Sequence, residues 1–195
     1  MTLLCALRGV FTRLDPHGFQ ACDLRDDAQI ADLVKATKSR FGRIDFLVNV
    51  ACSYLDNGAE TSRADWLTAL DINIVGSVML MQAARAELAA TKGAIVNFGS
   101  ISSRVAQTGR WVYPVSKAAI LQLTRNQAMD LAPEGIRVNA VRPGIIDTDI
   151  HASGGLPNRA RDLASQIPMQ RPGTAEETAQ AIVWLLSDIA SYVTG

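Results

Sequence analysis

The strongest constraint on the fold is an alternation, from Gln20 onward, of short apolar runs with longer stretches of helical periodicity. This alternation is typical of α/β proteins, in which a crossover helix follows each strand. The runs cover residues 44–50 (IDFLVNV), 94–98 (AIVNF) and 137–141 (RVNAV). The first two are apolar enough to be buried on both faces, as strands of a parallel sheet are. The sequence therefore predicts an α/β fold, a doubly wound, Rossmann-like parallel sheet in three α/β/α layers.

Helix ends are marked by residues that cap or stop helices. Asp26 and Asp27 open a helix that Gly42 ends, and Thr174 with Glu177 forms a capping box at the start of the last helix. Apolar residues at helical spacing predict two longer helices between these ends, over residues 65–88 and 113–131. A shorter run that ends at Cys22-Asp23-Leu24 is interpreted as a further strand.

The length of 195 residues suits a single domain, residues 1–195, with a core of ordinary size. Residues 1–19 form an atypical N-terminal segment. Residues 145–173 are irregular and rich in glycine and proline, which is typical of a substrate loop.

Charge and composition exclude several functional classes. Nineteen basic and nineteen acidic side chains cancel, so no electrostatic footprint indicates nucleic acid or an anionic membrane. We expect no membrane span, because no stretch reaches the apolar length that one needs. Three cysteines without a Cys-x-x-Cys pair and two isolated histidines indicate neither a disulfide framework nor a metal site. These features predict a cytoplasmic protein with a small-molecule partner.

A tyrosine and a lysine four residues apart open the helix predicted over residues 113–131. Side chains at this spacing share one helix face, so the phenol of Tyr113 and the ammonium of Lys117 converge. A free phenol has a pKa of about 10, and a nearby positive charge lowers it by stabilising the phenolate. The pair is therefore a candidate for proton transfer. The spacing alone is more often that of an amphipathic helix with a half-buried tyrosine and a surface lysine.

Ser100 changes the balance between these two interpretations. It follows directly after the predicted strand 94–98. In parallel α/β sheets, ligands bind at the carboxyl ends of the strands. A hydroxyl at this position can hydrogen-bond a substrate carbonyl or carbinol oxygen, although a lone serine here is more often an ordinary loop residue.

At this point the chain resembles the classical short-chain dehydrogenase/reductase family over residues 20–195. The matching segments run in the order of the family pattern. They are Cys22-Asp-Leu24, Leu47-Val-Asn-Val-Ala-Cys52, Asp71-Ile-Asn73, Ile95-Val-Asn-Phe-Gly-Ser100, Tyr113-Pro-Val-Ser-Lys117, Arg137-Val-Asn-Ala-Val-Arg-Pro-Gly144 and Tyr192-Val-Thr-Gly195. So many ordered matches are far more specific than any single motif.

The resemblance implies catalytic roles at matching positions. Tyr113 is implied as the general acid/base and Ser100 as the residue that orients the substrate oxygen. Lys117 is implied to lower the pKa of the phenol and to bind the nicotinamide ribose, and Asn73 to hold the water of a proton relay. The implied activity is hydride transfer between NAD or NADP and a small alcohol or ketone. The implied assembly is a homodimer or homotetramer, paired through the helices 65–88 and 113–131.

The resemblance also implies a cofactor site. Asp23 and Leu24 would contact the adenine ring, and Asn49 with Ala51 would form the turn beside the ribose. The segment with Pro143, Gly144, Ile146 and Thr148 would line the nicotinamide amide. Val50 and Cys52 depart from the family's Asn-Asn-Ala-Gly turn, and a side chain at Cys52 disfavours the positive φ that glycine allows.

The family's glycine-rich pyrophosphate loop has no counterpart, because Gly9 and Gly18 are the only glycines before Gly42. The pattern therefore implies a sheet that is incomplete at its N-terminal strands and at its last strand, in a chain truncated at both ends. Such a deletion exposes an edge of the strand 44–50. We hypothesise that residues 2–7 (TLLCAL) insert there as a surrogate first strand.

Three functions remain open at this stage. The chain is an oxidoreductase, a cofactor-poor protein that acts as a binding or oligomerisation module, or an isomerase or epimerase that uses the same tyrosine and lysine.

Overall fold

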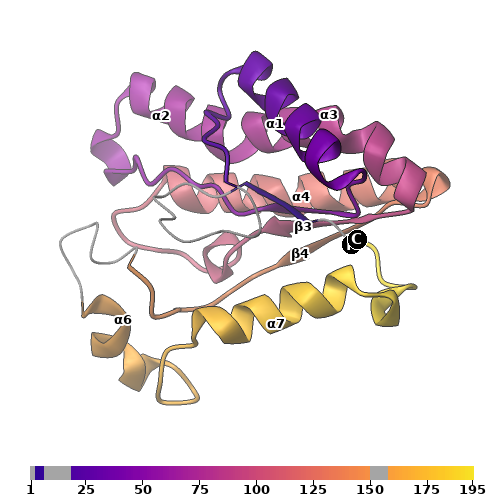
Figure 1. The fold of residues 1–195 in the computed structure, drawn as a ribbon. Helices are drawn as coiled ribbons and strands as arrows, with labels where there is room; N and C mark the ends of the chain where they lie inside the picture. The colour runs from indigo at the N-terminus through magenta and orange to yellow at the C-terminus, as the bar shows by residue number, and fades with distance from the viewer. Residues whose placement is uncertain (1–2, 7–18, 150–157) are drawn as a thin grey trace.

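A four-stranded parallel sheet forms the centre of the computed structural model, which describes residues 3–6, 19–149 and 158–195. The strands follow one another across the sheet in the order β1-β2-β3-β4 (Figure 1). They cover Leu3–Ala6 (β1), Phe46–Asn49 (β2), Ala94–Phe98 (β3) and Arg137–Val141 (β4). The predictions for β3 and β4 are confirmed residue for residue, and β2 is shorter than the predicted strand 44–50.

The surrogate first strand is confirmed for Leu3–Ala6. This segment pairs in parallel with Phe46–Asn49 and covers the edge that the shortened sheet would leave exposed. The strand predicted to end at Leu24 is wrong, since Asp23 and Leu24 enter a turn closed by the hydrogen bond from Asp26 N to Asp23 O (3.0 Å). A strand needs a neighbour to pair with, and β1 is the last strand on that side of the described sheet.

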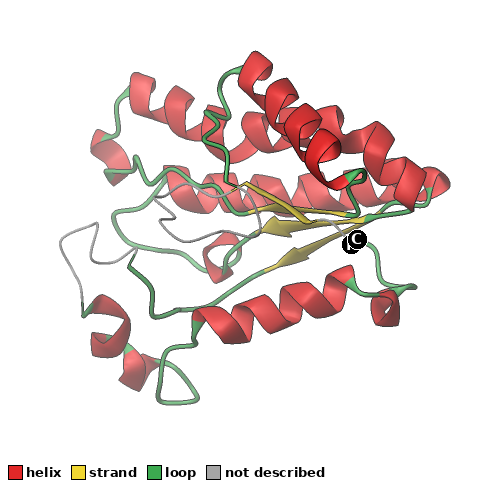
Figure 2. Cartoon of the chain, in the orientation of Figure 1, coloured by secondary structure: helices red, strands yellow, loops and turns green. Residues whose placement is uncertain are grey.

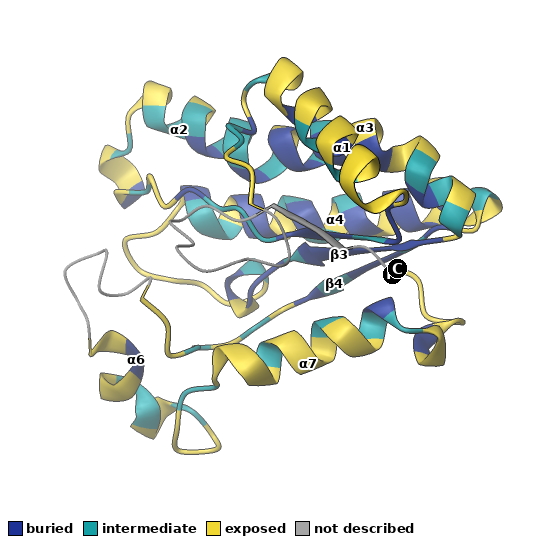
Figure 3. Cartoon of the chain, viewed as in Figure 1, coloured by how far each residue is buried: buried dark blue, intermediate teal, exposed yellow. Residues whose placement is uncertain are grey.

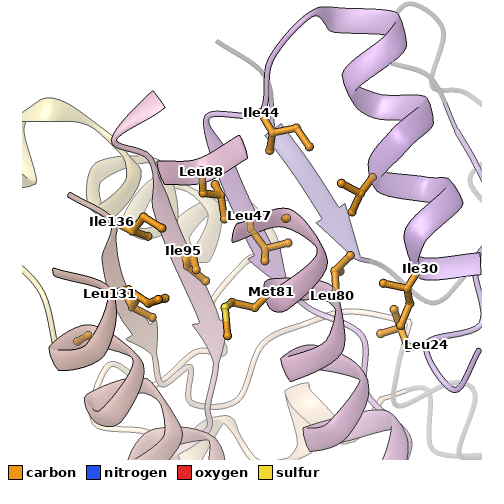
Figure 4. Close-up of a cluster of buried hydrophobic side chains, with 14 residues drawn as sticks. Leu24, Ile30, Ile44, Leu47, Leu80, Met81, Leu88, Ile95, Leu131 and Ile136 are labelled. Atoms are coloured by element: carbon orange, nitrogen blue, oxygen red, sulfur yellow. The ribbon is translucent and has the colours of Figure 1, made fainter. Parts of the chain in front are cut away.

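Four helices pack on one face of the sheet (Figures 1 and 2). They are α1 (Asp27–Phe41), α2 (Arg63–Leu70), α3 (Gly76–Thr91) and α4 (Val112–Leu131). The predicted ends of α1 are confirmed, because Asp26 accepts hydrogen bonds from the first turn and Gly42 takes a left-handed conformation. Figure 4 shows the core of this layer, in which Ile30 lies beside Leu80 and Ile95 belongs to the same buried cluster.

The helix predicted over residues 65–88 is longer and is interrupted. A π-helical turn, Asp71–Val75, separates α2 from α3. Immediately after it, a Cβ on Gly76 would lie 2.6 Å from Leu24 O, so only glycine allows α3 to approach this close to the turn at Leu24. The helical stretch Arg63–Thr91 is long and apolar enough to cross a membrane by length and composition alone, which corrects the sequence-based expectation. Its Leu80 and Leu88 are nevertheless fully buried against the sheet.

A single long helix, α7 (Ala175–Leu186), packs on the opposite face of the described sheet and completes the third layer (Figure 2). The predicted capping box between Thr174 and Glu177 is present at its start. Beneath it, Val48, Val96 and Leu186 form a second core cluster. Figure 3 shows β3 and β4 buried between helices whose outer faces are exposed.

The remaining elements are short. They are the helix α6 (Arg159–Asp162) and single 3₁₀ turns at Gly58–Glu60, Ile101–Ser103, Ala132–Glu134, Ala164–Gln166 and Asp188–Ala190. The predicted substrate loop 145–173 is described only in part, since residues 150–157 lie outside the described residues; Ile146 and Gly173 join its two ends through a parallel bridge. The C-terminal residues lie along β4, where Gly195 N donates to Val138 O (2.8 Å).

Candidate active site

The candidate catalytic residues meet at the carboxyl edge of the sheet. Ser100 follows β3, and Tyr113 lies in the first turn of α4, which packs against β3 and β4. Ser100 is buried, and its Oγ accepts a hydrogen bond from Ser102 N (3.1 Å). Its hydroxyl is also hydrogen-bonded to the Tyr113 hydroxyl. The serine that sequence alone could not distinguish from a loop residue therefore contacts the phenol.

The side chain of Tyr113 is half-buried. Burial raises the pKa of Tyr113 above its ordinary value, and hydrogen bonds from Ser100 and Tyr54 oppose this shift. The nearby Cys52 adds to the upward shift. At neutral pH the phenol is therefore protonated and can act as a proton donor.

Lys117 lies one helical turn after Tyr113, as its spacing predicts. Its Nζ is 5.6 Å from the centroid of the Tyr113 ring and donates to Phe98 O at 2.8 Å. The side chain is buried, which lowers the pKa of Lys117, and a hydrogen bond with Cys52 opposes that shift. Ser100 and Lys117 are thus brought together around the phenol of Tyr113.

Asn73 lies in the π-helical turn and is buried. Its Oδ1 accepts from Ser53 N at 2.5 Å, and its Nδ2 donates to Ser53 O (3.1 Å) and Ser116 Oγ (3.2 Å). The amide therefore braces the turn after β2 against α4, one residue before Lys117. The implied water-holding role of Asn73 stays a prediction.

The turn after β2 holds a buried polar network. Asn49 Nδ2 donates to Asn97 Oδ1 (2.9 Å), and Asn97 Nδ2 donates in turn to Thr124 Oγ1 (3.0 Å) and Gln127 Oε1 (3.1 Å). Among the atoms that the structure describes, none donates to the buried Asn49 Oδ1. Such an unpaired acceptor is costly unless a ligand or water satisfies it.

Cys52 does not strain this turn. In the described part of the chain, the non-glycine residues with positive φ are Lys92 and Gln170, so Cys52 does not need the conformation that its missing glycine would allow. Ala51, directly before it, is half-buried and packs against the core of the α1 layer.

Two functional residues escaped the sequence analysis. Tyr54 stacks on Tyr113, with ring centroids 5.1 Å apart and an interplanar angle of 24°. Asp56 caps the N-terminus of α4, since its carboxylate accepts from Trp111 N (2.9 Å) and Tyr113 N (2.8 Å). Neither residue has a spacing signal in the sequence, because each meets Tyr113 only after the β2 turn folds against α4.

The Asp56 carboxylate is held ionised by these donors. Partial burial raises the pKa of Asp56, but the backbone N–H groups of Trp111, Tyr113 and Gly58 together bring it below its ordinary value. Gly58 helps to form this turn. It has a φ of 56°, and a Cβ on it would lie 3.2 Å from the backbone of Gly109.

The other residues predicted to bind the cofactor differ in burial and in their contacts. Asp23 is ion-paired with Arg25 at 2.6 Å near the surface, whereas Leu24 is buried in the core. Pro143 O accepts from Ile101 N (3.1 Å), which ties the segment after β4 to the one after β3. The remaining residues of that segment range from half-buried Ile146 to exposed Gly144 and Thr148.

The described residues fit the nicotinamide ribose end of a dinucleotide. An ammonium has three donors, and Phe98 O and the Cys52 thiol engage two of those on Lys117, which leaves one for a ligand hydroxyl. The unpaired Asn49 Oδ1 offers a buried acceptor at the same edge. Gly9 and Gly18, the only glycines before Gly42, lie outside the described residues. No group of three or more His, Cys, Asp or Glu side chains within residues 3–6, 19–149 and 158–195 is placed to hold a metal ion.

Comparisons with known proteins identify the family of the chain. Residues 7–195 match the family model described as enoyl-(acyl carrier protein) reductase. The chain is 43% identical over 180 residues to the uncharacterized oxidoreductase YgfF of Escherichia coli, covering 89% of this chain and 73% of that protein. It is 36% identical over 197 residues to the 3-oxoacyl-[acyl-carrier-protein] reductase FabG of Thermotoga maritima, covering 100% of this chain and 78% of that protein.

A solved structure shares the fold as well. The structure of ElxO with NADP bound superposes with a TM-score of 0.81 at 32% identity, covering 91% of this chain and 73% of that one. The matching family model covers nearly the whole chain, and the relatives are oxidoreductases by name. The chain belongs to the short-chain dehydrogenase/reductase family of oxidoreductase enzymes.

Proposed function

We propose that this enzyme transfers a hydride between NAD or NADP and a small alcohol or ketone, with Tyr113 as the general acid/base. The observation that carries the proposal is the Tyr113 phenol, which is hydrogen-bonded to Ser100 and flanked by the Lys117 ammonium at the carboxyl edge of the sheet. The NADP that accompanies ElxO supports a nicotinamide cofactor of either kind.

The chemistry divides between cofactor and protein. A reduced nicotinamide, when bound, would supply the hydride for the carbonyl carbon. Ser100 Oγ donates a hydrogen bond that orients the carbonyl oxygen, and Tyr113 gives its phenolic proton to that oxygen. Lys117 stabilises the phenolate that remains, because its charge lies close to the Tyr113 ring. In the reverse direction the phenolate takes the proton from the alcohol.

The raised pKa of Tyr113 affects how the rate of each direction depends on pH. Burial keeps Tyr113 protonated, which is the form that ketone reduction needs. Alcohol oxidation needs the phenolate, so its rate is expected to rise with pH toward and beyond neutrality. Rates of both directions across a pH series check this, and oxidation that falls with rising pH would contradict it.

We propose that the cofactor is held by residues from several segments at this edge. The free donor of Lys117 would bind a ribose hydroxyl, with Asn49 and Ala51 beside the ribose. Asp23 and Leu24 would contact the adenine. The nicotinamide amide would lie against the segment that follows β4, through Pro143, Gly144, Ile146 and Thr148.

Titration of the purified protein with NADH and with NADPH, followed by nicotinamide fluorescence, tests the proposal. Saturable binding of one of them, followed by turnover with a panel of small ketones, is the expected result. A chain that is folded by circular dichroism but binds neither cofactor would overturn it and favour a binding or oligomerisation module. A reaction that isomerises its substrate without net oxidation of cofactor would favour the epimerase alternative.

We also propose that the enzyme is a cytoplasmic, single-domain homodimer or homotetramer. Exposed apolar side chains on the helices of one layer support this assembly, among them Leu67 on α2 and Val115 on α4. Analytical ultracentrifugation measures the assembly directly, and a monomer at micromolar concentration would overturn it.

A further inference from the structure

Tyr54 forms a second phenol at the candidate site. It comes from the turn after β2, whereas Tyr113 comes from the first turn of α4, 59 positions further along the sequence. The two rings stack with centroids 5.1 Å apart and planes inclined by 24°. In this stacked arrangement, the van der Waals contact between the rings restricts both the orientation and the position of the Tyr113 ring.

A hydrogen bond also links the hydroxyl groups of the two tyrosines, and it shifts their pKa values in opposite directions. Desolvation by neighbouring side chains raises the pKa of Tyr54, although the residue is 44% exposed, and the hydrogen bond raises it further. The same bond lowers the pKa of Tyr113. The positive charge of Lys117 Nζ, 5.6 Å from the Tyr113 ring, favours the phenolate on Tyr113, so Tyr54 is the donor when one of the pair ionises. The proton leaves Tyr113 first, and Tyr54 keeps its own.

Other charged and titratable groups near the pair act in known directions. Lys117 Nζ lies 5.6 Å from the Tyr113 ring, where its positive charge favours the phenolate. Cys52 raises the pKa values of both tyrosines. The Asp56 carboxylate is bound to the backbone of Tyr113 and is directed at the helix N-terminus.

We propose that Tyr54 is a positioning residue for Tyr113: its ring holds the Tyr113 ring by stacking, and its hydroxyl donates to the Tyr113 oxygen. The proposal rests on the proposed function for its catalytic consequence but not for its structural content. Once Tyr113 has given its proton away, its oxygen accepts from Tyr54, while the Ser100 hydroxyl stays directed at the substrate oxygen. The bond from Tyr54 strengthens as negative charge develops on the Tyr113 oxygen, so it stabilises the transition state more than the ground state.

The structural part is tested without substrate or cofactor. The chain has three tyrosines, Tyr54, Tyr113 and the fully exposed Tyr192, so labelling the tyrosine Cζ with carbon-13 gives three signals that single Tyr→Phe variants assign. Tyr54→Phe keeps the stacked ring and removes the hydroxyl alone. The expected result is a change in the Tyr113 signal at neutral pH, with Tyr192→Phe as the matched control that leaves it unchanged.

The same spectra, followed from about pH 7 to about pH 11, bracket the ordinary phenol pKa of about 10. A hydrogen bond to a charged oxygen corresponds to a shift of about one to two pH units, so Tyr113 in Tyr54→Phe titrates later by about that amount or not at all in this range. A Tyr113 signal that Tyr54→Phe leaves unchanged, both at neutral pH and in its titration, would overturn the proposal.

The catalytic consequence is measured on the holoenzyme. Tyr54→Phe is expected to lower kcat about tenfold, as loss of one hydrogen bond to a charged group does, while the Kd of the cofactor stays the same. The pH profile of alcohol oxidation should move to higher pH in step with the Tyr113 signal. A signal that shifts while kcat and the pH profile do not would confirm the contact and reject its role. Absence of all turnover in the unmodified chain would instead count against the proposed function.

Discussion

The two ends of the proposed cofactor and substrate site are held in different ways. Around Tyr113, the contacts join segments far apart in the sequence: Asp56 caps α4 and Asn73 joins the β2 turn to Ser116. Around Asp23, the contacts are local: its carboxylate pairs with Arg25, two residues away, and its backbone N–H donates to Gln29 in the first turn of α1. Asn73 is buried and Asp23 lies near the surface.

This difference indicates which end is preorganised. Buried hydrogen bonds are strong because water does not compete for them, and they keep reacting groups in place before a ligand arrives. Exposed local ion pairs contribute little to stability and rearrange readily. The end with Tyr113 is therefore built for chemistry, whereas the end with Asp23 can adapt to the ligand.

The largest expected effect breaks the chemistry at the preorganised end. Tyr113→Phe removes the transferable proton but keeps the ring, so kcat is expected to fall about 100-fold to 10,000-fold, the usual share of general acid/base catalysis. The Kd of NADH or NADPH should change little, which fluorescence titration measures. Turnover that survives this substitution would remove Tyr113 from the mechanism.

The next effect concerns Asn73, whose hydrogen bonds join the turn after β2 to α4. Asn73→Ala removes three hydrogen bonds and leaves buried Ser53 backbone groups unpaired, which costs about 2–4 kcal/mol of unfolding free energy. Urea denaturation measures it. Asn126→Ala is the matched control, because the hydrogen bond of Asn126 to Gln122 is exposed and its loss costs about 0.5 kcal/mol or less. Equal losses of unfolding free energy in the two variants would show that the buried hydrogen bonds of Asn73 stabilise the fold no more than the exposed one of Asn126.

A smaller effect is expected from the cap on α4. Asp56→Ala should cost about 1–2 kcal/mol of stability, as loss of an N-cap does, and should lower kcat because Tyr113 N loses its partner. The pKa of Asp56 is depressed in the folded state, so its contribution is complete above the unfolded pKa of about 3.9 and disappears as the pH falls through the lower, folded value.

The pH dependence supplies the control for this cap. The stability difference between the parent chain and Asp56→Ala should be constant from about pH 7 to about pH 5 and should shrink only at more acidic pH. A difference that grows on acidification would show that the carboxylate is not the stabilising form.

The smallest effect is expected at the adaptable end. Asp23→Ala breaks an exposed ion pair with Arg25, so the midpoint of urea unfolding should not move measurably. The substitution should leave kcat unchanged and should raise the Kd of the cofactor severalfold, if Asp23 contacts the adenine as proposed. A loss of kcat with unchanged Kd would reverse the comparison between the two ends.

Local sequence signals predicted most of the secondary structure. β3 and β4 match their apolar runs, and the capping box with Thr174 starts α7 as expected. The strand at Cys22–Leu24 was wrong because a strand depends on a neighbour that lies elsewhere in the chain. The π-helical turn at Asn73 was missed because it arises where α3 approaches the turn at Leu24, and periodicity averaged over the helix hides it.

The candidate site was predictable to a similar extent. The spacing of Tyr113 and Lys117 and the position of Ser100 after a strand made an acid/base centre possible, and the ordered family motifs favoured it over an ordinary helix and loop. Tyr54 and Asp56 were not predictable, because their roles depend on a contact between the β2 turn and α4 across more than fifty residues. A stacking partner and a cap supplied from a distant loop leave no periodic pattern in the sequence.

The sequence by itself determined the α/β class, the order of the strands along the chain and the helical face shared by Tyr113 and Lys117. These properties depend on local periodicity, which has the same meaning in any fold. The sequence offered the pairing of Leu3–Ala6 with β2 only as a hypothesis, which the tertiary structure confirmed, and the tertiary structure alone decided that Tyr54 would lie on Tyr113. Pairing and stacking join residues that only the folded chain brings into contact, so their energy is not encoded at either residue alone.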